Sequence, residues 1–317
     1  METYAKKTFL ALKNPYHTVE QVYPGVIDQV RPAREKWGYA CYTGYKQTET
    51  VPGQLMRKME DGGFLTHTRD RMSPGGRAVD MQLVNPLTGR PMTGSSSGTA
   101  LNVFYRINDL GVGTDGGGSV LAPAAALNLY GFISPLIEEE EMKKFGKIST
   151  DGIPFSPSLG LITRDTRTLL RAAGHLLKLD LEGESRREPV RTEEKIDRYG
   201  PRREAIAYLK ETVHPGVILI SEEGPVDFYG LGDTVFGHFD PETEALQRKS
   251  GKGLMRVVTM CGLSAVTVPG ERLGCCRVLI CSSVPEEIRE MLLLAGQYGA
   301  PADELTERYF GNLNMYF

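Results

Sequence analysis

Residues 91–126 read PMTGSSSGTALNVFYRINDLGVGTDGGGSVLAPAAA, and this stretch decides how the rest of the chain is interpreted. It holds two loops of small residues, GSSSG at residues 94–98 and GTDGGGS at residues 113–119. Glycine adopts backbone conformations that other residues avoid, and it lets a ligand approach the backbone closely. Each loop adjoins an apolar segment, which a flexible linker would not do. We therefore expect the two loops to shape a binding or catalytic site.

The second loop has the residue types that acyl transfer requires. Ser119 follows three consecutive glycines, Gly116, Gly117 and Gly118. Backbone N–H groups in such a run can converge on one point and bind an anion. Acyl transfer needs a nucleophile, a base within its reach and donors for the developing oxyanion. The pattern favours Ser119 as the nucleophile, with the amides of residues 116–119 as oxyanion donors.

Two other interpretations of the glycine loop stay open on residue chemistry alone. A glycine-rich loop also holds phosphate groups, but the Walker pattern requires a lysine where Val120 follows Ser119. A G-x-G-x-x-G register begins at Gly111, yet no clear βαβ unit surrounds it, and Pro123 disturbs the helix that should follow. The remaining alternative is a structural turn.

Composition and charge narrow the class of protein. The 317 residues are 40% hydrophobic and 24% charged, as in an ordinary globular protein. The net charge of −3 gives no support for binding nucleic acids or acidic membranes. The five cysteines show no metal-ligand spacing, which favours reduced thiols and a cytoplasmic location. Prolines and polar residues interrupt the longest apolar region, residues 120–137, so we interpret it as buried elements rather than a membrane span. We expect no metal and no cofactor.

Short apolar runs alternate with helical patterns along the chain, which predicts an α/β protein with helices covering a central sheet. Strands are expected at residues 9–12, 63–68, 110–112, 153–155, 159–162, 217–221, 264–268 and 277–280. Helices are expected at residues 24–37, 51–61, 99–106, 164–177, 206–211, 241–258 and 285–298. The remaining expectations are a long surface loop at residues 69–93, a solvated turn at residues 138–144, an exposed excursion at residues 178–200, and one domain over residues 1–317.

The two loops together resemble the core of the amidase signature family. The family pattern is G-G-S-S-G-G-S-A, then a fixed spacer, then G-T-D-x-G-G-S-I-R-x-P-A. Its members use a Ser-cisSer-Lys triad, so the resemblance implies Ser119 as nucleophile and Ser95 as the bridging serine after a cis peptide bond. The family lysine follows a short apolar strand in a V-A-V-K-D pattern. Residues 9–14, FLALKN, match that pattern and imply Lys13 as the base.

The resemblance extends over residues 51–68, 146–163 and 261–269 and therefore implies the family fold, a central twisted mixed β-sheet with helices on both faces. Departures from the pattern are Thr93 and Ser97 for glycines, Leu121 for an arginine and Asn14 for an aspartate. The family's N-terminal helical segment ahead of the lysine strand, and a longer stretch after residues 164–177, are missing or short. The resemblance thus implies a compact member.

The function that the resemblance implies is a serine amidohydrolase that cleaves a small carboxamide through an acyl-enzyme and releases ammonia or an amine. We expect Asp115 to be a buried carboxylate that accepts backbone N–H bonds and braces the loop. Ser96 and Thr114 are expected to support the site, and His67 is a candidate for the pocket.

A second class of function involves no hydrolysis. The chain would then be an amidotransferase-type or scaffold subunit of a complex, or a catalytically weak pseudoenzyme. The aromatic tail, Tyr309, Phe310, Tyr316 and Phe317, keeps a partner subunit or a homodimer open, because exposed aromatic side chains favour interfaces.

Overall fold

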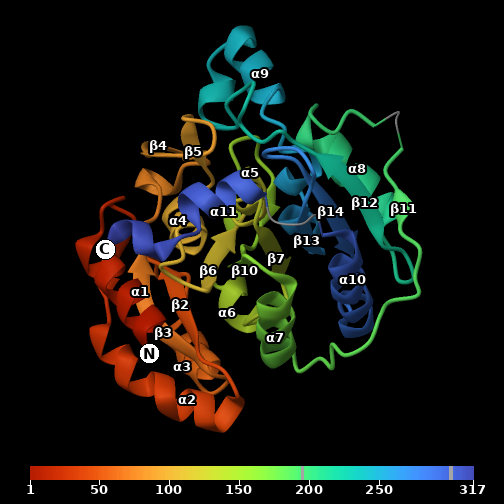
Figure 1. Ribbon diagram of the computed structural model, residues 1–317. Coiled ribbons are helices and arrows are strands. Elements are labelled where there is room, and N and C mark those ends of the chain that lie inside the picture. Colours follow the sequence, from red (N-terminus) through yellow and green to blue (C-terminus); the bar gives the residue numbers. More distant parts are fainter. Residues whose placement is uncertain (194–195, 300–302) are drawn as a thin grey trace.

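The structure is a computed structural model that describes residues 1–193, 196–299 and 303–317. In these ranges ten strands form one mixed sheet through the middle of the molecule (Figure 1). The expected α/β class is confirmed. The strands follow in spatial order as β1 (Val19–Val22), β3 (Phe64–Asp70), β2 (Cys41–Lys46), β6 (Leu110–Asp115), β10 (Ser158–Thr163), β7 (Tyr130–Ser134), β13 (Ser264–Pro269), β14 (Cys276–Cys281), β12 (Leu219–Glu223) and β11 (Val190–Arg191).

Strand direction decides which residues meet at the sheet edge. β2 runs parallel to both of its neighbours, β3 and β6, with Thr43 opposite Leu110. β10 runs antiparallel to β6, with Ser158 opposite Asp115. Parallel strands bring their carboxyl ends to the same edge of a sheet, where ligands bind in open α/β folds. The last residues of β2 and β6, Lys46 and Asp115, therefore lie at one edge.

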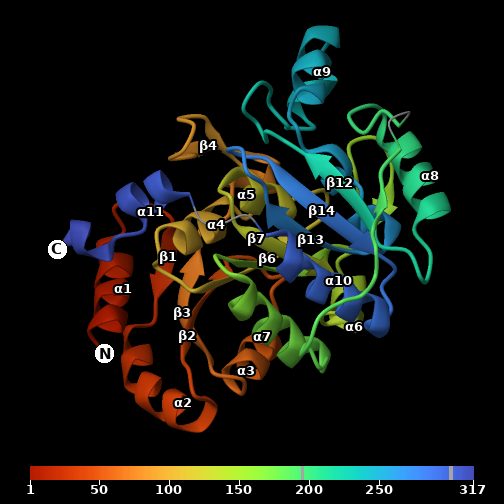
Figure 2. The ribbon, with the colours of Figure 1, turned by 45° about the vertical axis from the view of Figure 1, so that its right-hand side comes forward.

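Helices cover both faces of the sheet, as expected (Figure 2). One face packs against α4 (Ser97–Phe104) and α5 (Leu121–Ala126), and the other against α3 (Gly53–Glu60), α7 (Thr166–Leu177) and α10 (Pro285–Tyr298). Every residue of α4 is buried. Small residues permit this, since a Cβ atom at Gly98 would lie only 2.5 Å from the carbonyl oxygen of Arg71.

The first predicted strand is wrong. Residues 9–12 belong to the helix α1 (Glu2–Lys13), which ends at Asn14 with a left-handed φ of 44°. The buried positions of α1 are Lys7, Thr8, Leu10 and Ala11, a spacing that fits one helical face. A four-residue apolar run cannot by itself distinguish this face from a strand.

The strand β2 was not predicted, because its sequence, CYTGYK, shows no alternation between apolar and polar residues. All six of its residues are buried. A strand covered on both faces has no polar face to produce a period of two. Two helices, α1 and α2 (Val30–Trp37), and the 3-10 helix η1 (Pro24–Gln29) precede β2, so helical segments do lie ahead of this strand.

Four other segments differ from expectation. Residues 69–93 contain a hairpin, β4 (Val79–Val84) and β5 (Pro91–Thr93), rather than only a loop. The helix expected at residues 241–258 ends early, as α9 (Pro241–Arg248), because Gly251 and Gly253 adopt positive φ angles. The charged run at residues 138–144 forms the short helix α6 (Glu139–Lys143), and β11 lies within residues 178–200, of which residues 194–195 are outside the described residues.

The C-terminal segment packs on its own chain. It comprises α11 (Glu304–Phe310) and the 3-10 helix η6 (Leu313–Tyr316). The Phe310 ring lies 5.3 Å from the Phe104 ring, and the Tyr16 hydroxyl donates to the Tyr316 hydroxyl over 2.7 Å. These contacts place the aromatic tail against α4 and the residues that follow α1. In the part of the chain that is described, the helices are too short or too polar to cross a membrane.

Candidate active site

A buried lysine lies at the end of β2. The Lys46 ammonium nitrogen, Nζ, is 2.7 Å from the Ser95 hydroxyl and 2.8 Å from the Thr114 hydroxyl. Lys46 is 2% exposed. Thr114 comes from β6, the parallel neighbour of β2, and Ser95 from the loop that leads into α4. Three segments that are distant in sequence therefore place their polar atoms together at one edge of the sheet.

The surroundings of Lys46 favour its neutral form. Burial lowers its pKa to about 7, because an ammonium ion loses its hydration in the interior. The Asp115 carboxylate opposes this effect and raises the pKa, whereas the charge of Lys147 lowers it further. A lysine with this pKa can accept a proton near neutral pH.

Ser119 lies on the loop between β6 and α5 and is partly exposed. Its hydroxyl accepts a hydrogen bond of 3.4 Å from the backbone N–H of Ser95. Ser95 thus contacts Lys46 through its side chain and Ser119 through its backbone. The expected cis peptide before Ser95 is wrong for this structure, because the cis peptide bond found in the described ranges is Gly224–Pro225.

Asp115 braces the glycine-rich loop that carries Ser119, as the sequence predicted. Its carboxylate is fully buried and accepts a hydrogen bond from the Thr259 hydroxyl over 3.0 Å. It also accepts from four backbone amides, those of Gly117 (3.1 Å), Gly118 (2.8 Å), Val120 (2.7 Å) and Leu121 (3.3 Å). An acceptor shared by so many donors holds the loop in one conformation.

This brace changes the expected oxyanion site. The amides of Gly117 and Gly118 donate to Asp115 in this structure, so they are not directed at a substrate. The amides of Gly116 and Ser119 form no bond with Asp115. Of the four backbone amides expected as oxyanion donors, those of Gly116 and Ser119 are therefore free of Asp115 and can donate to a developing negative charge.

Two segments pack closely on the glycine run. A Cβ atom at Gly116 would lie 2.6 Å from the ring of Phe155, which belongs to the hairpin of β8 (Lys147–Ile148) and β9 (Pro154–Phe155). A Cβ atom at Gly117 would lie 3.5 Å from the carbonyl oxygen of Arg256, in the 3-10 helix η4 (Gly253–Arg256). Gly116 must therefore be glycine unless Phe155 moves.

Ser96 and His67 do not face an open site. The Ser96 hydroxyl is buried and donates to the carbonyl oxygen of Thr114 over 3.5 Å, in line with a supporting position. His67 is fully buried, its Nδ1 atom lies 2.7 Å from Asn108, and its ring stacks on Tyr42. Burial lowers the pKa of His67 to about 4. The expectation that His67 lines the pocket is wrong, since a side chain without exposed surface cannot contact a ligand.

Lys13 is not brought to the serines. It ends α1 on the outside of the molecule, where its Nζ lies 3.3 Å from the carbonyl oxygen of Tyr316. Its assignment as the base rested on a strand that is in fact this helix, and the structure corrects it. Lys46 occupies the corresponding place. The sequence contained one indication of Lys46, namely its position along the chain. Lys46 ends an apolar run and lies shortly before the helix correctly predicted at residues 51–61.

In the described part of the chain, no group of three or more His, Cys, Asp and Glu side chains has the geometry to hold a metal ion. The polar atoms around Ser119 are hydroxyls, backbone amides and the Lys46 nitrogen. Such a set suits proton transfer and nucleophilic attack.

Comparison with known proteins agrees with this geometry. Residues 73–172 match the family described as Amidase, and the matched segment contains Ser95, Asp115 and Ser119. This matched segment is 100 of the 317 residues, so the family match covers about a third of the chain. It is similar to Amidase 1 of Arabidopsis thaliana, with 38% identity over 99 residues, or 30% of this chain. The match spans 21% of that relative's length.

Solved amidase structures share the fold. A crystal structure described as amidase matches with a TM-score of 0.60 and 15% identity over 92% of this chain and 93% of the other. The peptide amidase of Stenotrophomonas maltophilia matches with a TM-score of 0.56 and 13% identity over 95% of each chain. These likenesses confirm the amidase-signature fold predicted from the two serine loops.

Proposed function

We propose that the protein hydrolyses the C–N bond of a small carboxamide, with Ser119 as nucleophile, Ser95 as relay and Lys46 as base. The observation that supports this proposal is the buried lysine, which has a pKa of about 7 and an Nζ atom 2.7 Å from the Ser95 hydroxyl. General bases work best when their pKa lies near the operating pH. The match of residues 73–172 to the amidase family supports the same reaction.

The reaction begins when neutral Lys46 takes the Ser95 proton while Ser95 takes the proton of Ser119. The Ser119 oxygen then forms a bond to the amide carbon, and the carbonyl electrons move onto its oxygen. The amides of Gly116 and Ser119 stabilise this oxyanion, and in other enzymes the loss of one such donor costs about 3–4 kcal/mol. The proton returns through Ser95 to the amine as the C–N bond breaks.

Deacylation uses the same groups in reverse order. Water attacks the ester carbon of acylated Ser119 and gives its proton through Ser95 to Lys46. The carboxylic acid leaves, and Ser119 regains its proton. Each turnover thus consumes one water molecule and produces one acid and one amine or ammonia, with no net change in the enzyme.

We also propose a cytoplasmic location, which the thiols support. All five cysteines are free. Burial raises the pKa of Cys41, Cys276 and Cys281, so these thiols stay protonated and unreactive. Free thiols of this kind are usual in a reducing compartment.

A fluorophosphonate probe tests the nucleophile, because it reacts covalently with activated serines. We expect labelling of the wild type, and Ser119→Ala should abolish it. The matched control is Ser156→Ala, an exposed serine next to Phe155, which should label at the wild-type rate. Labelling that persists in Ser119→Ala would show that another residue is the nucleophile. A wild type without labelling or ammonia release from primary amides would instead favour a scaffold or amidotransferase-type subunit.

A further inference from the structure

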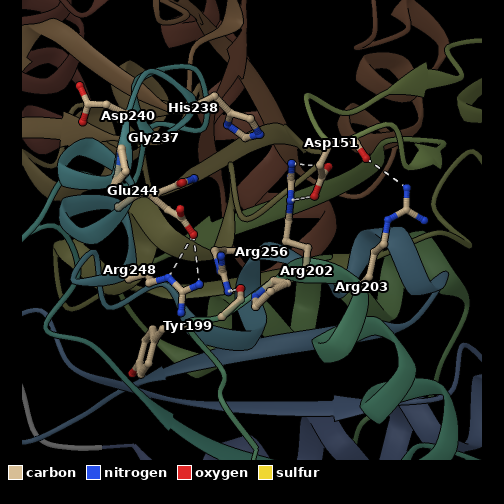
Figure 3. A pocket seen from close by; sticks show the side chains of 14 residues that line it. Asp151, Tyr199, Arg202, Arg203, Gly237, His238, Asp240, Glu244, Arg248 and Arg256 are labelled. Carbon is tan, nitrogen blue, oxygen red and sulfur yellow. Dashed lines mark hydrogen bonds and ion pairs between the residues drawn. The ribbon is translucent and has the colours of Figure 1, made fainter.

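A cavity of about 520 Å³ is lined by the side chains drawn in Figure 3. Its walls come from α8 (Arg202–Thr212), α9, the residues before α8, η4 and the turn between β8 and β9. The charged side chains that line it are Asp151, Arg202, Arg203, Asp240, Glu244, Arg248 and Arg256. The arginines outnumber the carboxylates by one, so the cavity has room for one more negative charge.

Most of these charges are already engaged. Arg202 binds Asp151 through Nε at 2.9 Å and Nη2 at 2.6 Å, and Arg248 binds Glu244 at 3.1 Å. Figure 3 shows both pairs turned toward each other. Arg203 donates to the backbone carbonyl oxygen of Asp151.

Arg256, like Arg203, has no carboxylate partner among the described residues, but unlike Arg203 it is buried. It is 9% exposed, and among the described residues it forms no ion pair. Its hydrogen bonds go to carbonyl oxygens only, from Nε to Gly253 at 3.1 Å and from Nη2 to Arg198 at 2.7 Å and Gly200 at 3.1 Å. Burial and the neighbouring charge of Arg202 lower the pKa of Arg256 to about 10. The charges of Glu223 and Asp197 oppose this effect without forming an ion pair, so a carboxylate bound at Arg256 would stabilise its charge further.

The cavity shares its walls with the nucleophile loop. The Arg256 backbone lies against Gly117, and Thr259, three residues later, donates to Asp115. Asp151 belongs to the hairpin whose Phe155 packs on Gly116. One wall of the cavity therefore packs against the residues next to Ser119.

We propose that this cavity binds the carboxylate of an acidic amide substrate and that Arg256 determines this specificity. The inference rests on the hydrolase function proposed above. Nε and Nη2 of Arg256 already donate to carbonyl oxygens, which leaves Nη1 to donate a charge-assisted hydrogen bond to a carboxylate oxygen. Because Arg202 and Arg248 already pair with carboxylates, the cavity favours a ligand with a single carboxylate over a polyanion.

Binding is tested with glutarate as the probe, titrated calorimetrically into the Ser119→Ala variant so that no turnover interferes. Glutarate should bind at least tenfold more tightly than the neutral glutaramide. Adding Arg256→Gln should weaken glutarate binding at least tenfold, whereas adding Arg191→Gln, an exposed arginine on β11, should leave it within twofold. Equal affinity with and without Arg256→Gln would overturn the proposal.

A substitution that should strengthen glutarate binding distinguishes a ligand-binding role of Arg256 from a structural one. Asp151→Asn removes the internal carboxylate that occupies Arg202. It should therefore tighten glutarate binding several-fold, a result that a purely structural arginine cluster would not produce. If Arg256→Gln fails to fold, unchanged or weaker glutarate binding in Asp151→Asn overturns the proposal by itself.

Kinetics on a matched substrate pair complete the test. In the protein with Ser119 intact, Arg256→Gln should lower kcat/KM for glutaramate through KM and leave that for glutaramide unchanged. An equal loss on both substrates would contradict the proposal. Normal fluorophosphonate labelling without glutarate binding would refute the anion site alone, and glutarate binding without labelling would refute the hydrolase alone.

Discussion

The assignment of Lys46 as the base can be tested through its charge state. At pH 7 a lysine with the ordinary pKa of 10.5 is neutral in roughly 0.03% of molecules, whereas one with a pKa of about 7 is neutral in roughly half. Burial thus raises the fraction of competent base by roughly 10³. Lys46→Met keeps the side chain long and apolar but removes the acceptor, and it should slow fluorophosphonate labelling of Ser119 about 10²–10⁴-fold.

The pH dependence of the labelling rate tests which protonation state of Lys46 is active. The neutral lysine is the active form, so the wild-type labelling rate should rise with pH and level off above about 7. In Lys46→Met this inflection should disappear. A wild-type profile that is flat between pH 6 and 8, or a Lys46→Met variant that labels at the wild-type rate, would refute the reasoning.

A neighbouring charge provides a finer test. Lys147 is exposed, and its charge lowers the pKa of Lys46. Lys147→Gln should therefore move the inflection to higher pH by on the order of 0.3 unit, and less at high salt, as expected for screened Coulomb interactions. The control is Lys144→Gln, an exposed lysine paired with Glu141. A shift to lower pH in Lys147→Gln would contradict the assignment.

The same pKa predicts a stability effect. Between about pH 7 and 10.5 the unfolded chain protonates Lys46 and the folded protein does not, so the folded state gains stability as pH rises. In this window the wild type should lose about 1.4 kcal/mol per pH unit relative to Lys46→Met as pH falls. Urea unfolding at several pH values measures the difference, and parallel curves for the two proteins would count against a buried neutral lysine.

Three further substitutions test other parts of the structure. Lys13→Ala should leave labelling of Ser119 unchanged, because Lys13 lies on the surface of α1; a loss of labelling would return it to the site. Asp115→Ala should lower the free energy of unfolding by at least ~3 kcal/mol and abolish labelling, because several buried donors lose their acceptor. Asp227→Asn should cost about 3–5 kcal/mol by leaving Lys252, 3.1 Å away, buried without its partner, and adding Lys252→Met should recover part of that loss.

Local sequence was enough to predict one half of the site. Ser95, Asp115 and Ser119 lie within a short stretch, so their motif can be read without knowing the fold. Helices with a clear periodic spacing of apolar residues, such as α7 and α10, were also predicted close to their observed bounds. In each case the prediction depends only on residues that are close together in the sequence, because these residues determine the local backbone structure.

Only the tertiary structure led to Lys46 as the proposed base. The parallel pairing of β2 with β6 brings Lys46 to Thr114, residues that no local pattern connects. Burial then lowers the pKa of Lys46 to about 7, because a lysine becomes a base near neutral pH only where water is excluded. Lys13 had the more familiar local pattern, yet it lies in water at the end of a helix, and a side chain's charge state depends on its surroundings in space.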